Sequence, residues 1–443
     1  MKINRKSVAD FFKLGSFPGA RRIFLRIEYD KQGKLFKKWA RLHRRYFLKQ
    51  TRIIAVVGSL GKTSTRQAVA LALNCPDRNF SYSNYGSSLA GNLLRIQRRD
   101  KYAVLEAGIA GPGYMASYAE MIRPNLVIVT SIASDHNRSF TTLLDTREEK
   151  VKMVSTLGRD GIAILNGDDE NVRWMASKTQ ARVVTFGIKA GNDVRATKIE
   201  PNEDGSTSLE IQTGGARFHF HSPLSGEHMI YPVLAAVTVA HLEGVEMAGA
   251  LARLGRMTPA PSRMEWLTLP NGIRVLDDSC KSSQESIESA FDTFSKIRAT
   301  RKIVVIGRIE HVAGKESDRN RELGTRLAQF ADFILCTGDG PIKSLRAAAV
   351  DAGMEFSRIK VLDSRIEGAY EWLQSILQPG DAVLFKGGST QRLRRIVLQL
   401  MGKPVACRLK YCGVKVATCD NCPLLNAPET FYENYFVSRY IKL

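Results

Sequence analysis

The chain of 443 residues has no apolar run that approaches the roughly 18 residues needed to cross a bilayer. Its basic start at residues 1–6 leads into no apolar core of a secretory signal, so we expect a cytoplasmic protein. Internal repeats and low-complexity tracts are lacking as well. What is present is an ordinary globular composition, 44% hydrophobic and 25% charged, in a chain long enough for roughly two or three domains.

Acidic residues are scarce relative to basic ones: 44 Asp and Glu stand against 65 Lys and Arg, a net charge of +21. Residues 1–50 hold 15 Lys and Arg and 3 Asp and Glu, so 15 − 3 = +12 of this excess lies there. Apolar side chains recur among them at helical spacing, at Leu35, Trp39, Leu42 and Tyr46. The simplest interpretation is an arm docked on the body with a solvated basic face. A basic amphipathic helix also suits an anionic membrane surface, so peripheral membrane contact through residues 1–50 is the second interpretation. A nucleic-acid contact is less favoured than either.

Cysteine is sparse, with seven residues in all, but four of them lie close together near the end of the chain. These four are Cys407, Cys412, Cys419 and Cys422. In a cytosolic protein such a cluster indicates a tetrahedral Zn²⁺ site more than disulfides. Only Cys419 and Cys422 have the usual C-x-x-C spacing, so free or redox-active thiols are the alternative.

The segment Gly-Ser-Leu-Gly-Lys-Thr-Ser at 58–64 follows an apolar run and precedes a helix-like run. A strand, a glycine turn and a helix N-terminus direct backbone amides at one point, which suits a phosphate. Lys62 adds a positive charge for the β- and γ-phosphates, and the Thr63 hydroxyl is a ligand for Mg²⁺. The strict P-loop spacing is absent, because Val56 stands where that pattern has its first glycine. The predicted nucleotide-binding residues here are Gly58, Gly61, Lys62, Thr63 and Ser64.

Strand-like runs alternate with helical segments from residue 53 to about 400, which predicts an α/β fold. We expect a basic N-terminal extension (1–50) and a central doubly wound P-loop domain (51–259). A second, Rossmann-like domain (260–402) and a Cys-rich tail (403–443) follow. The Pro-Ala-Pro-Ser stretch at 259–262 is the best candidate for the linker, and residues 191–221 have the alternation of β-hairpins.

Three polar side chains follow the phosphate loop at positions where the ends of parallel strands place ligand-binding groups. Glu106 ends a strand-like run, His136 follows the next one, and Lys150 lies fourteen residues further on. Taken singly, each has a simpler interpretation as a helix cap, a loop histidine or a solvated lysine. Their order and spacing indicate a functional set.

The ordered set of motifs resembles the Mur ligase family, the ATP-dependent enzymes that add amino acids to cell-wall precursors. The phosphate loop, the Glu-Ala-Gly at 106–108, Asp-His at 135–136 and Lys150 match that family in order. Past the linker, Arg263 stands where the family has a Gly-Arg, and Phe-Lys-Gly-Gly-Ser at 385–389 is similar to a later motif of the family. Asp-Asp-Ser at 277–279 follows the next strand, as in the branch that adds D-alanyl-D-alanine. A weaker likeness, at 84–88, is to the substrate-side loop. The resemblance covers about residues 51–400.

The resemblance implies an ATP-dependent ligase that activates a carboxylate as an acyl phosphate and joins it to an amine. It implies Mg²⁺ held by Thr63 and Glu106, a second ion held by His136, and Lys62 on the transferred phosphoryl group. The family lysine matching Lys150 is carbamylated by CO₂ into a metal ligand, whereas an ammonium would repel Mg²⁺. Arg263 and Asp278 of the second domain are implied to contact phosphate and ribose, so catalysis would depend on domain closure.

Two of the departures from the family bear on its substrates. The asparagines that read adenine are replaced by Met229 and Pro232, so base recognition is looser or made by other groups. Only about 50 residues precede the phosphate strand, fewer than the roughly 80 that a UDP-binding domain needs. We therefore expect a lipid-linked, polymeric or other acidic acceptor, held near the basic arm. The alternatives are a nucleotide-binding partner subunit without turnover and, least favoured, a nucleic-acid-binding module built from the arm and a zinc tail.

Overall fold

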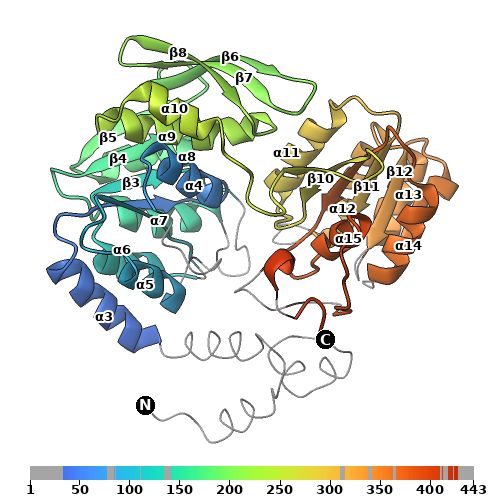
Figure 1. Cartoon of the computed structure of the whole chain (residues 1–443), viewed down its shortest axis with the longest axis horizontal. Coiled ribbons are helices and arrows are strands. Elements are labelled where there is room, and N and C mark those ends of the chain that lie inside the picture. Colours follow the sequence, from blue (N-terminus) through green and yellow to red (C-terminus); the bar gives the residue numbers. More distant parts are fainter. Residues whose placement is uncertain are drawn as a thin grey trace, which may run out of the picture. The chain divides into compact units, whose positions relative to one another are not determined.

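The computed structural model describes residues 33–76, 84, 86–109, 111–133, 140, 142–309, 315–337, 342–362, 366–409, 412, 418–422 and 424–427. The chain divides between Ala260 and Pro261 into two compact units, which are described separately below (Figure 1). Each unit has a mostly parallel sheet with helices on both faces. The predicted α/β fold is therefore confirmed.

The first unit contains an eight-stranded sheet whose order is β2-β1-β3-β4-β5-β6-β7-β8. Its strands are β1 (Arg52–Val57), β2 (Tyr102–Glu106), β3 (Leu126–Val129), β4 (Ile162–Asn166), β5 (Arg182–Gly187), β6 (Val194–Pro201), β7 (Thr207–Thr213) and β8 (Ala216–Ser222). The strands β1 to β6 pair in parallel, and β7 and β8 add an antiparallel hairpin at one edge. The apolar runs of β1 and β3 are buried on both faces, as expected for central parallel strands.

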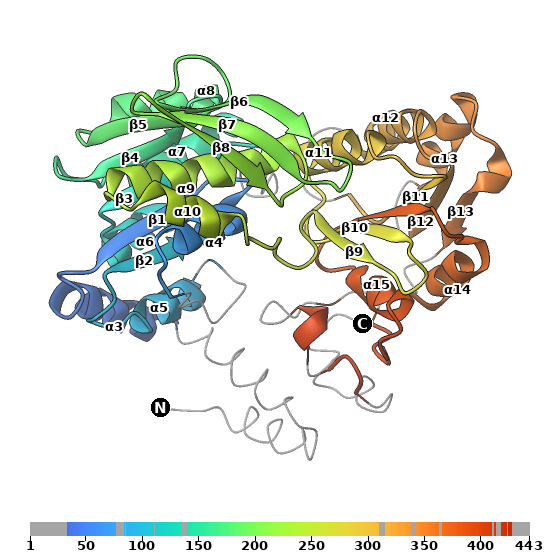
Figure 2. The same cartoon turned by 45° about the horizontal axis from the view of Figure 1, so that its top comes forward.

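Helices cover both faces of this sheet (Figure 2). They are α3 (Gly33–Tyr46), α4 (Lys62–Ala72), α5 (Gly86–Leu94), α6 (Tyr114–Ile122), α7 (Leu143–Val154), α8 (Glu170–Arg173), η1 (Trp174–Lys178), η2 (Glu227–Met229), α9 (Ile230–Leu242) and α10 (Met247–Leu254). One hydrophobic core packs α3, α5, α6 and α7 against the sheet, and the other packs α4, α9 and α10. This arrangement leaves the carboxyl ends of β1, β2 and β3 free to carry a ligand site.

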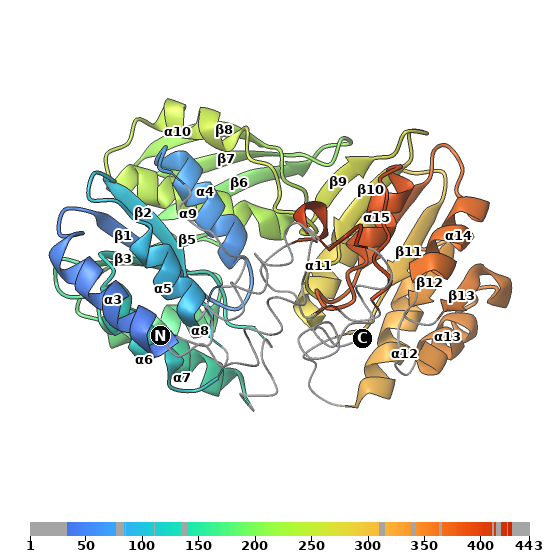
Figure 3. The same cartoon turned by 60° about the horizontal axis from the view of Figure 1, so that its bottom comes forward.

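Helix α3, in the basic N-terminal segment, lies beside α5 and α6 (Figure 3). Arg44 is buried, and its guanidinium donates to the carbonyls of Ile122 and Arg123 at the end of α6, with Nη2 2.9 Å from the latter oxygen. A cation at a helix C-terminus satisfies the last carbonyls and complements the dipole. The described part of the arm is thus docked on the first unit. Among the described residues, no helix combines the length and apolar character that a bilayer crossing requires.

The second unit has a six-stranded sheet of order β13-β12-β11-β14-β10-β9, in which β9 alone is antiparallel to its neighbour. Its strands are β9 (Glu265–Thr268), β10 (Arg274–Asp278), β11 (Lys302–Ile306), β12 (Phe333–Thr337), β13 (Ile359–Leu362) and β14 (Ala382–Lys386). Its helices are α11 (Gln284–Ser295), α12 (Glu316–Ala328), α13 (Ile342–Asp351), η3 (Phe356–Arg358), α14 (Ile366–Ile376), α15 (Arg394–Leu400) and η4 (Cys419–Asn421). Helices α11 to α13 pack on one face, and α14 and α15 on the other.

The described part of the Cys-rich tail rests on α15. The buried guanidinium of Arg395 donates to the carbonyls of Cys407 and Leu409 at 3.1 and 2.5 Å. The amide of Cys412 donates to the carbonyl of Thr390 at 2.7 Å. These backbone contacts make this part of the tail an integral layer of the second unit.

Candidate active site

The phosphate loop has a backbone that only glycine adopts without strain. Gly58 has a φ of 141°, and a Cβ atom there would lie 2.0 Å from the Thr130 hydroxyl. Gly61 has a φ of 76° and directly precedes Lys62, the first residue of α4. Glycine has no side chain with which to cap the helix, so the first amides of α4 can meet an anion. The turn that the sequence predicted is therefore present at the end of β1.

The loop is held in place by the residues that follow the neighbouring strand β3. The amide of Ser59 donates to the carbonyl of Ser131 at 2.7 Å, and the amide of Leu60 donates to the Ser131 hydroxyl at 3.1 Å. The Thr130 hydroxyl donates to the Leu60 carbonyl at 2.6 Å. A loop fixed in this way does not have to be ordered when a phosphate binds, which lowers the entropic cost of binding.

Thr63 and Glu106 come together because β1 and β2 are neighbours in the sheet. The Thr63 hydroxyl donates to Oε2 of Glu106 at 2.9 Å, while Nδ2 of Asn84 donates to Oε1 at 2.6 Å. Hydroxyl and carboxylate oxygens are the ligands that Mg²⁺ prefers. The pair therefore fits a magnesium ion at the phosphate loop. Sequence reasoning did not assign Asn84 a role, and its only signal was the weak likeness at 84–88.

Two lysines point into the same loop. The Nζ atom of Lys62 donates to the Ser59 carbonyl at 2.9 Å, and that of Lys150, on α7, donates to the Ser59 hydroxyl at 2.8 Å. Lys62 is 9% exposed and Lys150 only 1% exposed. Buried amines concentrated at one loop create a site for an anion, because desolvated positive charge attracts phosphate strongly. Ser59 is the residue that both lysines contact, and sequence reasoning did not single it out.

His136 lies outside the described residues, so its predicted role as a ligand stays a prediction. The chain that leads toward it is fixed by Asp169, whose Oδ2 accepts from the Ile132 amide at 2.7 Å. Burial raises the pKa of Asp169, although backbone amides oppose this shift. Sequence reasoning did not name Asp169. The available signal was an acidic residue shortly after the end of a strand, β4.

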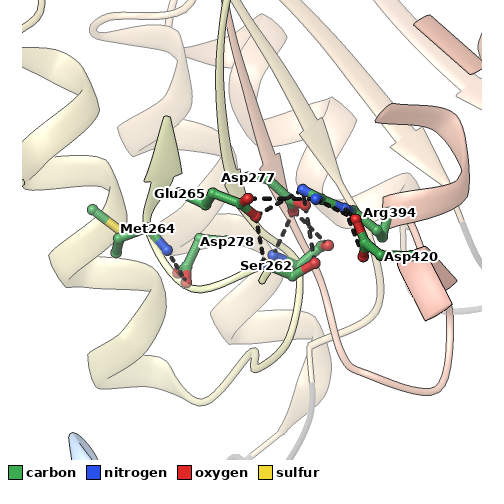
Figure 4. Close-up of polar contacts among 8 residues, drawn as sticks. Ser262, Met264, Glu265, Asp277, Asp278, Arg394 and Asp420 are labelled. Atoms are coloured by element: carbon green, nitrogen blue, oxygen red, sulfur yellow. Dashed lines mark hydrogen bonds and ion pairs between the residues drawn. The ribbon is translucent and has the colours of Figure 1, made fainter. Parts of the chain in front are cut away.

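In the second unit, the predicted ribose ligand Asp278 ends β10 and has protein partners for both oxygens. Its Oδ1 accepts from the Met264 amide at 3.2 Å (Figure 4). Its Oδ2 accepts from Nζ of Lys386 at 2.5 Å. Lys386 is fully buried, and desolvation lowers its pKa although Asp278 opposes the shift. Arg263, the predicted phosphate ligand, lies one residue before Met264 and is half-buried.

Arg394 joins three carboxylates that are far apart in the sequence (Figure 4). Its Nη1 atom lies 2.7 Å from Oε2 of Glu265 and 2.9 Å from Oδ2 of Asp277, and its Nη2 atom lies 2.6 Å from Oδ1 of Asp420. Asp277 is completely buried and also accepts from the Ser262 hydroxyl at 2.9 Å. The cluster therefore joins β9, β10 and the tail beside Asp278.

The helix that reads adenine in the family begins differently here. Pro232 lies in the first turn of α9, where its missing amide hydrogen costs no helical bond. Met229 precedes the helix and is buried. The hydroxyl of Tyr231 donates to Oδ2 of Asp168 at 3.0 Å. Burial raises the pKa of the Tyr231 phenol, and the negative charge of Asp168 raises it further. The described start of α9 thus carries a structural tyrosine–aspartate bond in place of the family's amide side chains.

The four tail cysteines line one cavity of about 20 Å³, together with Arg392 and Arg395. Burial raises the pKa of Cys419 to about 12 and that of Cys422 to about 11, which keeps both thiols protonated at neutral pH. Across the described ranges, no group of three or more His, Cys, Asp or Glu side chains is arranged to hold a metal ion. The predicted zinc site at Cys407, Cys412, Cys419 and Cys422 is therefore not supported among the described residues, and it stays a prediction beside the alternative of free or redox-active thiols.

A glycine turn at the carboxyl end of a parallel strand, together with a second α/β unit, is typical of nucleotide-dependent enzymes. Comparison with known families identifies the chain further. Residues 56–240 match the Mur ligase middle domain, and residues 262–389 match the Mur ligase glutamate ligase domain. The chain belongs to the Mur ligase family, which confirms the resemblance, and it is an ATP-dependent ligase.

Named relatives agree with this assignment, and solved structures share the fold. The UDP-N-acetylmuramoyl-tripeptide–D-alanyl-D-alanine ligase of Escherichia coli K12 is 29% identical over 355 residues, 79% of this chain and 76% of that protein. The enzyme of the same name from Mycobacterium tuberculosis H37Rv is 27% identical, over 77% and 71% of the two chains. The fold is similar to MurF from Acinetobacter baumannii (TM-score 0.73, 21% identity, 83% and 80% covered). It is also similar to MurF from Thermotoga maritima in complex with ADP (TM-score 0.69, 21% identity, 83% of each chain covered).

Proposed function

We propose that this ligase activates the carboxylate of an acidic, cell-wall-precursor-like acceptor as an acyl phosphate and joins it to the amine of an amino acid or dipeptide. The observation that carries the proposal is the convergence of four side chains on one glycine loop, namely Lys62, Thr63, Glu106 and Lys150. Bringing a carboxylate to a triphosphate means bringing anions together, so neutralising charge is the main task.

Each side chain has a part in that task. Thr63 and Glu106 would hold the magnesium ion, which supplies neutralising charge on the phosphate oxygens when bound. Asn84 keeps the Glu106 carboxylate oriented toward Thr63. Lys62 lies at the N-terminus of α4, where it can bind the phosphoryl group that leaves ATP for the acceptor carboxylate. The amine then attacks the acyl carbon, forms the amide bond and displaces phosphate.

Lys150 is the proposed site of carbamylation. Its Nζ is buried beside the Ser59 hydroxyl, in a loop that must also accept a metal–phosphate complex. A CO₂ adduct converts this amine into an anionic oxygen ligand, as in the family that the chain belongs to, and His136 would complete the second ion's ligands. Arg263 and Asp278 would bind phosphate and ribose from the second unit.

The acceptor is inferred from the names of the relatives and from the charge of the N-terminal segment. The curated relatives carry the name of a UDP-N-acetylmuramoyl-tripeptide ligase that uses D-alanyl-D-alanine, and we propose the same chemical type of acid and amine here. Residues 1–50, which precede the matched middle domain, carry a charge of +12, which favours an anionic acceptor, lipid-linked or polymeric.

The test is ADP release by the full chain with cell-wall intermediates and a panel of amino acids and dipeptides. The proposal expects ADP release that requires both an acid and an amine, with the amide product found by mass spectrometry. Nucleotide binding without such turnover would instead identify a non-catalytic nucleotide-binding partner subunit. ADP release that is independent of any amine would contradict the ligase reaction for these substrates.

A further inference from the structure

Helix α3 presents large apolar side chains to solvent. Trp39 is 58% exposed, Leu42 39%, Tyr46 58%, and Phe47, directly after the helix, 59%. They are four of the eight large hydrophobic residues that are exposed in the described part of the chain. Trp39, Leu42 and Tyr46 recur at intervals of three and four residues, so they form one stripe along the helix. Such a concentration marks a surface that is covered by something else.

Basic side chains flank this stripe. Residues 33–50 contain seven Lys and Arg and no Asp or Glu. Lys38, Arg45 and Lys49 are exposed, and their intervals of seven and four residues place them along the edge of the stripe. The apolar surface therefore comes with a row of positive charge that is not balanced by acidic residues of the same segment.

The opposite face of α3 is fixed to the first unit. Ala40 and Arg44 are buried, Arg41 pairs with Glu120 of α6 at 2.6 Å, and Nε2 of His43 lies 2.9 Å from the Ile96 carbonyl. The exposed stripe is thus held in one orientation on a rigid body. A surface that is already formed loses little conformational entropy when it binds a flat partner.

We propose that this face of α3, formed by Trp39, Leu42 and Tyr46 with Lys38, Arg45 and Lys49, docks the protein on an anionic membrane surface. Charge complementarity selects the occupant, because a row of cations beside aromatic rings matches the headgroup region of an anionic bilayer. The aromatic rings enter the interface while the basic heads remain at the phosphates. The inference is independent of the ligase chemistry, although it would place the enzyme where lipid-linked acceptors lie.

The test is vesicle co-sedimentation of the full chain, with phosphatidylcholine alone and with phosphatidylcholine mixed with phosphatidylglycerol. We expect binding to the anionic vesicles that weakens with salt, and a blue shift of tryptophan fluorescence that Trp39→Phe removes. Replacing Lys38, Arg45 and Lys49 by Glu should weaken binding more than about tenfold. Trp39→Ser with Tyr46→Ser should weaken it to a similar extent.

Matched control variants show whether vesicle binding depends on this face of α3 or on exposed charge and apolar surface in general. Arg98→Glu with Arg99→Glu changes two exposed charges of the same unit, and Phe356→Ser removes an exposed aromatic ring of the other unit. Both controls should bind vesicles within about twofold of the wild type if α3 carries the interaction. ATP turnover measured without vesicles reports separately on the ligase.

Several results would overturn the proposal. Equal binding to neutral and anionic vesicles, or α3 variants that bind like the wild type, would remove it. A dimer in light scattering that Trp39→Ser with Tyr46→Ser dissociates, without vesicle binding, would show a second copy as the occupant. Vesicle binding that appears only after removal of residues 1–32 would show that the chain itself covers the face, and stronger retention on RNA would identify a nucleic-acid partner.

Discussion

The Nζ atom of Lys150 lies 2.8 Å from the hydroxyl oxygen of Ser59, although 91 residues separate them in the sequence. Ser59 lies in the glycine loop that leads into α4, and Lys150 lies on α7, which packs on the other face of the sheet. The contact therefore joins the phosphate site to a helix of that other layer. Since Lys150 is almost completely buried, its amine has a defined position at the loop before any ligand binds.

Lys150→Met should reduce turnover at least about a hundredfold, because it removes a charged group from the phosphate site while it fills the same volume. Steady-state ADP release measures the effect, and thermal unfolding should show an intact fold. Lys152→Met on the same helix is the control, since that amine is half-exposed and pairs with Glu149. A Lys150→Met enzyme with full activity would eliminate the role proposed for this amine.

Glu106→Gln should raise the Mg²⁺ concentration needed for half-maximal turnover by about tenfold or more, because an amide is a weaker ligand for a hard cation than a carboxylate. A titration of turnover with Mg²⁺ at saturating ATP measures the shift. Asn84→Ala should have a smaller effect, because it removes only the hydrogen bond that orients Glu106. An unchanged titration for Glu106→Gln would place the ion elsewhere.

Gly58→Ala should destabilise the first unit by more than about 2 kcal/mol, since it combines a strained backbone with a clash against Thr130. Gly191→Ala is the matched control, because Gly191 also has a positive φ, of 89°, but an added Cβ atom there meets nothing within 4 Å. The control should cost about 1 kcal/mol, from strain alone. Urea unfolding compares the two, and equal costs would show that the contact with Thr130 is relieved easily.

Glu149 should make stability depend on pH in the acidic range. Burial opposes its ionisation, but hydrogen bonds from Lys152 and the amides of Gly113 and Met115 outweigh burial and hold the pKa below its ordinary value of 4.5. An acid with a lowered pKa stabilises the fold above its unfolded pKa, and this contribution is lost as the pH falls through the folded pKa. The wild type should therefore lose stability more steeply than Glu149→Gln as the pH falls below the ordinary value of 4.5. Thermal melts across this range measure the difference, and parallel curves would exclude the effect.

Arg394→Met should destabilise the second unit by about 3–5 kcal/mol, because it leaves the completely buried Asp277 without its cation. Arg326→Met removes an exposed pair with Asp292 and should cost no more than about 1 kcal/mol. Urea unfolding followed by fluorescence distinguishes them. If the two costs were alike, the buried cluster would contribute no more than an ordinary surface pair.

Much of the first unit was predictable from local patterns. The apolar runs that end at Val57 and Glu106 identified their strands, and parallel pairing then places the strand ends at one edge. The family resemblance supplied the order of the motifs. Asn84 and Ser59 were missed because their roles depend on neighbours 22 and 91 residues away, which no local pattern encodes.

The second unit shows what a sequence pattern leaves open. The spacing of Cys419 and Cys422 predicts a metal site, but spacing does not specify how deeply the thiols are buried or which arginines lie beside them. Nη1 of Arg395 lies 3.3 Å from the sulfur of Cys407, and such a contact is invisible before the fold is known. The three carboxylates around Arg394 lie up to 129 residues from it in the sequence, so no local pattern predicts that they meet there.

The carboxylate of Asp420, between two of the tail cysteines, shares one guanidinium with β10 through Arg394. Truncation before Cys407 would consequently strip two carbonyl partners from Arg395 and one anion from Arg394, and it would uncover the helix beneath. The described part of the tail thus covers α15. Through Arg394 it also helps to hold Asp277 in place at the end of β10.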